Sequence, residues 1–238
     1  MEFTGERVVP ERTPERIYLD HLERYRFSAQ YVKGRKVVDI ACGTGYGTAL
    51  IADRGATDIT GIDISSESIN YARKKYQRKN LRFLVGDAMN IPLADESADV
   101  IVSYETIEHV PDYGAFLAEV KRVLRPGGTL IISSPNRLIT SPNKGLHDRP
   151  DNRYHNIEFT ADEFQELMLK TYSSCKFFGQ RQIPSFFMRK LIRRIISFIS
   201  NRLKINFKNR IFQQAGGPKV KQLRPHFEPR YIVAVCTL

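Results

Sequence analysis

The sequence predicts an α/β fold in which a mostly parallel sheet binds a nucleoside, and three observations support this prediction. Residues 37–40 form a short apolar run that ends in a glycine-rich loop, residues 43–47. A helical pattern follows, and a second apolar run, residues 61–64, contains an acid at Asp63. Further apolar runs then alternate with helical patterns, which is typical of βαβ units. In such a unit, glycines let the backbone approach the ligand and the acid accepts both ribose hydroxyls.

The spacing of the glycines favours one class of nucleoside cofactor. Dinucleotide sites carry Gly-x-Gly-x-x-Gly, whose third glycine lets the helix pack closely, whereas this loop reads Gly-x-Gly-x-Gly. Asp39, on the strand before the loop, would repel an anionic cofactor. An ammonium and a sulfonium suit this environment better, so the loop favours S-adenosylmethionine over NAD.

Later apolar runs end in residues suited to the same ligand. Residues 81–85 lead into Gly86-Asp87-Ala88, where an acid can accept from an adenine amino group. Residues 98–102 run into a segment with acidic and histidine side chains, and the Pro-Gly-Gly turn at 126–128 precedes a strand-like run at 129–133. Open α/β sheets bind ligands along the edge formed by the carboxyl ends of their strands, so these sites should lie together.

In this order, the motifs resemble those of the class I S-adenosylmethionine-dependent methyltransferases over residues 34–135. The resemblance implies a Rossmann-like, seven-stranded, mostly parallel sheet with an antiparallel last strand and helices on both faces. It implies S-adenosylmethionine as the cofactor and S-adenosylhomocysteine as the product. The alternative is a Rossmann-like domain whose cofactor site is degenerate. The predicted cofactor-binding residues are Asp39, Ala41, Gly43, Gly45, Tyr46, Asp63, Ile64, Asp87, Ala88 and Tyr104.

The predicted organisation has four segments. Residues 1–33 are a lead with a helix over residues 14–31, and its first residues resemble the lead of bacterial methyltransferases associated with surface-glycan synthesis. The methyltransferase core covers residues 34–181, a basic amphipathic helical insertion covers 182–230, and the last core strand is 231–238. Since the last two strands of this family pair antiparallel, the insertion would lie between them.

Local signals within the core predict two capped helices and a lid. Ser65 caps a helix over residues 66–77, and a capping box at residues 160–163 opens another helix. Residues 136–156 form a polar loop in the position expected for a substrate lid.

Length and composition limit the class of protein. A chain of 238 residues fits one α/β domain with additions. Its three cysteines predict no disulfide framework, and the odd number argues for a reducing compartment. The N-terminus has no apolar core of a secretion signal, and no stretch is long and apolar enough to span a membrane. We therefore expect a cytoplasmic protein.

Positive charge is concentrated near the C-terminus. Residues 170–238 contain 15 lysines and arginines and one acid, Glu228, although the whole chain has a net charge of +11. Residues 186–203 predict a helix with one apolar and one basic face, which can lie on an anionic membrane surface. Alternatively, the segment 186–210 closes the active site, forms a dimer contact or, less favourably, binds nucleic acid. The oligomeric state is left open.

Several side chains could catalyse methyl transfer, which is an in-line displacement that often needs proton removal from the acceptor. The loop after the fourth strand supplies Glu105, Glu108 and His109, and the lid supplies His155. Glu108, His109 and His155 are the candidate catalytic residues, and either histidine could act as general base.

The same residues could instead bind a divalent cation that lowers the pKa of a substrate hydroxyl. Glu105-x-x-Glu108-His109 with His155 resembles the metal-dependent small-RNA 2′-O-methyltransferases and the ubiquinone-pathway O-methyltransferases. The resemblance implies that these four residues are metal ligands. In a purely structural interpretation, Glu108 and His109 cap a helix and bind backbone.

These observations together predict a methyltransferase acting on an oxygen of a sugar, a glycan or another small hydroxylated acceptor. One alternative is a metal-assisted RNA 2′-O-methyltransferase, although no RNA-binding module is evident. Another is a catalytically silent scaffold that docks through residues 186–210.

Overall fold

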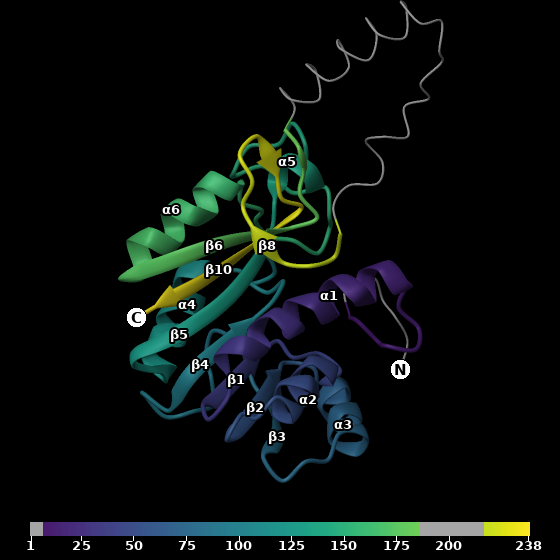
Figure 1. Cartoon of the computed structure of the whole chain (residues 1–238), viewed down its shortest axis with the longest axis vertical. Helices are drawn as coiled ribbons and strands as arrows, with labels where there is room; N and C mark the ends of the chain where they lie inside the picture. Colours follow the sequence, from purple (N-terminus) through teal and green to yellow (C-terminus); the bar gives the residue numbers. More distant parts are fainter. Residues whose placement is uncertain (1–6, 186–216) are drawn as a thin grey trace, which may run out of the picture.

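The computed structural model describes residues 7–185 and 217–238, and its centre is an eight-stranded sheet (Figure 1). The strand order is β3-β2-β1-β4-β5-β10-β6-β8. The first five strands pair in parallel, and β10 runs antiparallel to both β5 and β6. The strands are β1 (Lys36–Ile40), β2 (Asp58–Asp63), β3 (Leu81–Val85), β4 (Ala98–Ser103), β5 (Leu124–Pro135), β6 (Ser174–Gln180), β8 (Lys221–Gln222) and β10 (Tyr231–Thr237).

The predicted fold class is confirmed, with one correction to the number of strands. The seven predicted strands are present with an antiparallel β10, but β8 adds an eighth strand at the edge next to β6. A second small sheet pairs β7 (Ile183–Pro184) with β9 (Phe227–Glu228). These additional strands have only two residues each, which is too few to show an apolar pattern in the sequence. They form only through pairing with the strand beside them.

Helices cover both faces of the sheet. On one side lie α1 (Glu15–Ser28), the 3₁₀ turn Ala29–Tyr31, α2 (Tyr46–Asp53) and α3 (Ser66–Lys75) (Figure 1). On the other side lie α4 (Tyr113–Val123) and α6 (Ala161–Thr171), while the short α5 (Arg137–Thr140) follows β5.

The central strands are apolar because both of their faces are buried. On β4, Val100 and Val102 pack in the core beneath α1 and α2, whereas Ile101 packs in the core beneath α4 and α6. Leu130 and Ile131 on β5 divide between the two cores in the same way. Continuous apolar runs are therefore required here, as is usual in parallel sheets with helices on each face.

Both predicted caps are confirmed. The Ser65 side chain accepts a hydrogen bond from the backbone N–H of Ser68, and α3 ends two residues earlier than predicted, at Lys75. Thr160 and Glu163 form the reciprocal capping box that opens α6. The predicted N-terminal helix over residues 14–31 corresponds to α1 and the 3₁₀ turn.

A disulfide links β6 to β10, contrary to the expectation from the cysteine count. Antiparallel pairing places Cys175 of β6 directly opposite Cys236 of β10, and the structure joins them. Cys42 is free and buried. The expectation was wrong because the two partners are 61 residues apart and are brought together only by strand pairing. The cysteines therefore do not indicate a reducing compartment.

Much of the predicted insertion falls outside the described residues. Residues 186–216, which contain the predicted amphipathic helix, lie outside the described residues, and so do the first six residues of the lead. The described ends of the insertion form β7, β8 and β9 rather than helix. Of the helices in the described ranges, none has the length and apolarity needed to cross a bilayer.

Candidate functional site

A cavity of about 870 Å³ opens at the edge where the carboxyl ends of the parallel strands meet. Small-molecule sites usually have volumes of about 300–1,000 Å³, so the cavity can hold a cofactor together with part of an acceptor. Six predicted cofactor residues line it: Ala41, Gly43, Tyr46, Asp63, Ile64 and Tyr104. The four predicted catalytic or metal-binding residues line it as well: Glu105, Glu108, His109 and His155. Asp39, Gly45, Asp87 and Ala88 lie outside this wall.

The glycine-rich loop brings the backbone to the cavity. Gly43 lines the cavity itself, whereas Gly45 is the N-cap of α2 and has φ of +79°. A Cβ atom on Gly45 would lie 2.7 Å from the Cβ of Ala72 and from the ring of Phe83. Only glycine therefore allows α2 to begin this close to α3 and β3.

Asp63 ends β2 beside the loop and is oriented by two backbone groups. Its Oδ2 accepts from the N–H of Gly43 at 2.8 Å, and its Oδ1 accepts from the N–H of Ser65 at 2.9 Å. A carboxylate oxygen can accept more than one hydrogen bond, so both retain capacity for a ribose hydroxyl. The geometry suits the predicted role.

Asp39 is fully buried and supports the loop from within. It accepts from Thr48 Oγ1 at 2.6 Å and from the Tyr25 hydroxyl at 3.2 Å. Burial raises the pKa of Asp39 to about 7, and the nearby charge of Asp63 acts in the same direction. A contact between Asp39 and a cofactor ammonium remains a prediction.

The edge of the cavity near β2 and β3 presents apolar side chains to solvent. Ile64 is 73% exposed and Val85 is 46% exposed. Asp87 accepts from the N–H of Met89 at 2.9 Å, and Ala88 packs against the core. An adenine ring stacked on Ile64 would cover apolar area that is otherwise in water.

Helix α1 packs against the predicted cofactor residues through tyrosine side chains. The Tyr104 hydroxyl donates to the carbonyl of Arg24 at 2.8 Å and hydrogen-bonds Ser28, while the rings of Tyr25 and Tyr104 meet edge to face at 5.2 Å. Burial raises the pKa of both Tyr46 and Tyr104 above the ordinary phenol value, so both stay protonated. The Tyr46 hydroxyl can donate to a cofactor carboxylate or to an acceptor, whereas the proton of Tyr104 is already donated to Arg24.

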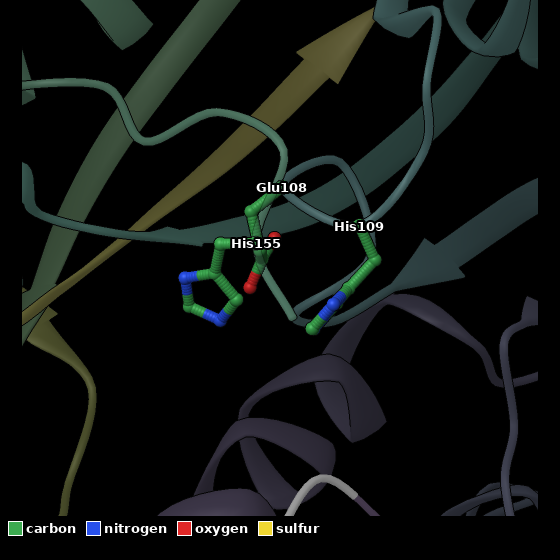
Figure 2. Close-up of side chains that lie close together, drawn as sticks. All are labelled: Glu108, His109 and His155. Atoms are coloured by element: carbon green, nitrogen blue, oxygen red, sulfur yellow. The ribbon is translucent and has the colours of Figure 1, made fainter. Parts of the chain in front are cut away.

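Glu108, His109 and His155 form one cluster in which a ligand atom from each lies within 4.8 Å of the others. Figure 2 shows the carboxyl group of Glu108 with His155 on one side and His109 on the other. Glu108 is fully buried, and neither carboxyl oxygen has a hydrogen-bond partner among the described residues. Burial, and next the charge of Glu105, raise the pKa of Glu108 well above that of an ordinary glutamate.

The hydrogen bonds of the two histidines indicate the role of each ring nitrogen. Nδ1 of His109 lies 3.0 Å from the carbonyl oxygen of Tyr154, and because a carbonyl only accepts, Nδ1 carries the proton. The lone pair of neutral His109 is then on Nε2. His155 Nδ1 lies 2.6 Å from Glu158 Oε1, and its Nε2 lies 2.9 Å from the amide nitrogen of Asn152.

These residues fit a divalent cation in donor type. One carboxylate and two imidazoles suit metals such as Zn²⁺ or Mn²⁺, and His155 has the carboxylate partner that often orients a ligating histidine. The unpartnered carboxyl oxygens of Glu108 are the observation that best fits a cation ligand. Glu105 lines the cavity but lies outside the group of three, since its Oε1 accepts from Ser133 Oγ at 2.7 Å.

Two groups of site residues were missed by the sequence reasoning. Glu158 contacts Nδ1 of His155 at 2.6 Å, and because residues 155–158 lie in a loop, no helical spacing signalled this pairing. Several α1 residues, including Tyr25 and His21, line the cavity. The helix itself was predicted, but its amphipathic pattern did not reveal that this face covers a ligand site.

Comparisons with known proteins agree with this geometry. Residues 38–132 match the methyltransferase domain family. A probable S-adenosylmethionine-dependent methyltransferase from Mycolicibacterium smegmatis is 38% identical over 169 residues, 71% of this chain and 63% of that protein. A fatty-acid O-methyltransferase from the same species is 34% identical over 142 residues, 55% of this chain and 52% of that protein.

Solved structures extend the likeness to most of the fold. A possible histamine N-methyltransferase from Thermotoga maritima has a TM-score of 0.61 and 22% identity, with 93% of this chain and 92% of that chain covered. At this identity the likeness shows the fold alone. The chain spans about three fifths of the length of the first curated relative and about half of the second. Residues 38–132 thus form a methyltransferase domain, and the match to this family together with the curated relatives identifies the chain as an S-adenosylmethionine-dependent methyltransferase, with S-adenosylmethionine as the cofactor.

Proposed function

We propose that the protein transfers the methyl group of S-adenosylmethionine to an oxygen of a small hydroxylated acceptor, such as a sugar, a glycan or a lipid-linked intermediate. The acceptor oxygen attacks the methyl carbon, the bond from that carbon to sulfur breaks, and S-adenosylhomocysteine leaves. The acceptor proton moves to a base of the enzyme. The observation that supports this best is that one cavity is lined both by six of the predicted cofactor residues and by the Glu108–His109–His155 cluster.

His109 is the base that this proposal favours. The carbonyl of Tyr154 holds its Nδ1 proton, so Nε2 is the atom that accepts. General base catalysis by a positioned histidine contributes about 10²–10⁴-fold to a rate. The preference for an oxygen acceptor is supported by the name of the fatty-acid O-methyltransferase relative.

A metal-assisted mechanism is the second candidate, favoured by the unpartnered, buried carboxyl group of Glu108 beside two histidines. A bound divalent cation would lower the pKa of an acceptor hydroxyl and hold it in place. Glu108, His109 and His155 would hold the ion.

Calorimetric titration of the full chain with S-adenosylhomocysteine, in EDTA and then in Mg²⁺ or Mn²⁺, tests the proposal first. We expect micromolar affinity, followed by methyl transfer to members of a panel of sugars, nucleotide sugars and hydroxylated lipids. A folded protein without affinity for S-adenosylhomocysteine would contradict the proposal and favour a silent scaffold. Activity that EDTA abolishes and Mn²⁺ restores would select the metal-assisted mechanism, whereas activity unchanged by EDTA would select His109 as base.

A further inference from the structure

We propose that the acceptor carries a carboxylate or phosphate group, which Arg230 and Arg16 bind in the same cavity. This inference rests on the proposed function and specifies its substrate class. The charged side chains around the cavity, and the partners that each of them has, support it.

Two carboxylates near the acceptor end, those of Asp20 and Glu158, already have partners. Asp20 forms an ion pair with Arg181 at 2.6 Å, and both side chains are largely buried. Glu158 contacts His155 at 2.6 Å and accepts from Thr140 Oγ1 at the same distance. The carboxylates of Asp20 and Glu158 are therefore already engaged by protein groups.

Two arginines of the same wall have no such partner. Arg7 forms an ion pair with Glu67, but the described residues provide neither a hydrogen bond nor an ion pair for the side chains of Arg16 and Arg230. The Arg230 guanidinium lies 5.9 Å from the ring of Tyr231, within range of a weak cation–π contact. A guanidinium that lines a partly enclosed cavity without an anion is suited to bind one from solution.

Arg230 is held at a defined place by the backbone. Its N–H donates to the carbonyl of Gln180 at 3.0 Å, and its carbonyl accepts from the N–H of Asn136 at 2.9 Å. It directly precedes β10, which is three strands from β1 in the sheet order. At about 4.8 Å per strand, this places Arg230 roughly 14 Å across the sheet from the glycine-rich loop.

That separation assigns the anion to the acceptor rather than to the cofactor. The predicted ribose-binding acid, Asp63, is on β2, still farther from β10. Arg16 is in the first turn of α1, next to the apolar Ile17, which lines the cavity too. An acceptor with an acidic group beside an apolar or sugar portion matches this wall.

Anion binding to the full chain saturated with S-adenosylhomocysteine tests the inference, with inorganic phosphate and acetate as separate probes at low ionic strength. We expect saturable calorimetric binding of at least one probe, and the tighter probe indicates whether the acceptor carries phosphate or carboxylate. Arg230→Ala should weaken that binding at least tenfold, and Arg16→Ala should weaken it less. Arg54→Ala is the matched control, because Arg54 follows α2 outside the cavity, and this variant should bind like the unchanged protein.

The outcomes separate the inference from the proposed function. If S-adenosylhomocysteine binds but both anions bind weakly and equally to the unchanged protein and to Arg230→Ala, the inference is wrong and the methyltransferase proposal stands. If Arg230→Ala loses affinity for S-adenosylhomocysteine itself, Arg230 serves the cofactor carboxylate and the inference is likewise overturned. If S-adenosylhomocysteine does not bind to the folded protein, the proposed function fails. A melting curve for each variant confirms that it is folded.

Discussion

The cofactor end and the acceptor end of the cavity are assembled in different ways. The cofactor end is built by one continuous βαβ segment, in which the backbone of Gly43 bonds to Asp63 only 20 residues later. The acceptor end combines α1, the loop after β4, the lid around His155 and the start of β10, which are separated by as many as about two hundred residues.

The two ends also differ in how well their buried polar groups are satisfied. At the cofactor end, the carboxylates of Asp39 and Asp63 each accept two hydrogen bonds from protein groups. At the acceptor end, both oxygens of Glu108 lack partners among the described residues. An unsatisfied buried group is costly, so the carboxyl group of Glu108 indicates where a ligand group is needed. The cofactor end is preorganised, and the acceptor end is completed by what it binds.

The largest effect should come from Asp63→Ala at the cofactor end. The change removes a carboxylate that would accept from both ribose hydroxyls, and each charge-assisted hydrogen bond is worth about 1.5–3 kcal/mol. We expect affinity for S-adenosylhomocysteine to fall by about 10³-fold in calorimetry. Asp58→Ala, at the other end of β2 where Asp58 pairs with Arg82, should retain normal affinity. Equal affinity in both variants would remove Asp63 from the cofactor site.

The second-largest effect should be confined to the acceptor end of the cavity. His109→Ala removes the favoured base, so kcat should fall by about 10²–10³-fold while affinity for S-adenosylhomocysteine is retained. His147→Ala is the control, because His147 is exposed in the lid loop and does not line the cavity. A parallel loss of cofactor affinity in His109→Ala would show that the two ends are not independent.

A smaller effect should appear in the pH dependence of stability. The folded-state pKa of Asp39 is about 7, above its ordinary value of 3.8, so folding favours the protonated form. The contribution of protonated Asp39 to the free energy of unfolding is therefore fully present below about pH 4. It is lost as pH rises toward 7, by up to about 1.4 kcal/mol per pH unit. Urea unfolding between pH 4 and 8 should show this loss in the unchanged protein and a shallower one in Asp39→Asn. Identical profiles would mean that Asp39 titrates normally.

The smallest effect concerns the anchoring of the lid. Thr160→Ala removes the cap of α6 directly after the segment that carries His155 and Glu158. Unfolding free energy should fall by about 1 kcal/mol, and Thr160→Ser should restore most of it. Affinity for S-adenosylhomocysteine should not change in either variant, because the cap is remote from the glycine-rich loop. A loss of that affinity would contradict the division into two ends.

Prediction from sequence succeeded where the signal is local. The turn of the glycine loop into α2, the end of β2 at Asp63, the helix cap at Ser65 and the capping box at Thr160 each depend on residues close together in the chain. The clustering of Glu108, His109 and His155 was also expected, because the carboxyl ends of parallel strands share one edge.

Prediction failed where distant segments decide the environment. The pairing of Cys175 with Cys236 follows from the register of β6 and β10, which no local pattern encodes. Glu105 is a metal ligand only by resemblance, and this stays a prediction; in the structure its carboxylate accepts from Ser133 of β5, and it lies outside the group of three clustered residues.

The sequence by itself determined the fold class, the glycine-rich loop and which segments form the strands that carry the site, because periodicity, glycine spacing and capping act over a few residues. Only the tertiary structure decided which side chains are left without partners. Burial raises the pKa of Asp39 and isolates the carboxyl group of Glu108, while Arg230 is brought to the cavity wall at the start of β10. Desolvation and charge pairing depend on every element packed around a group, and those elements meet only when the chain has folded.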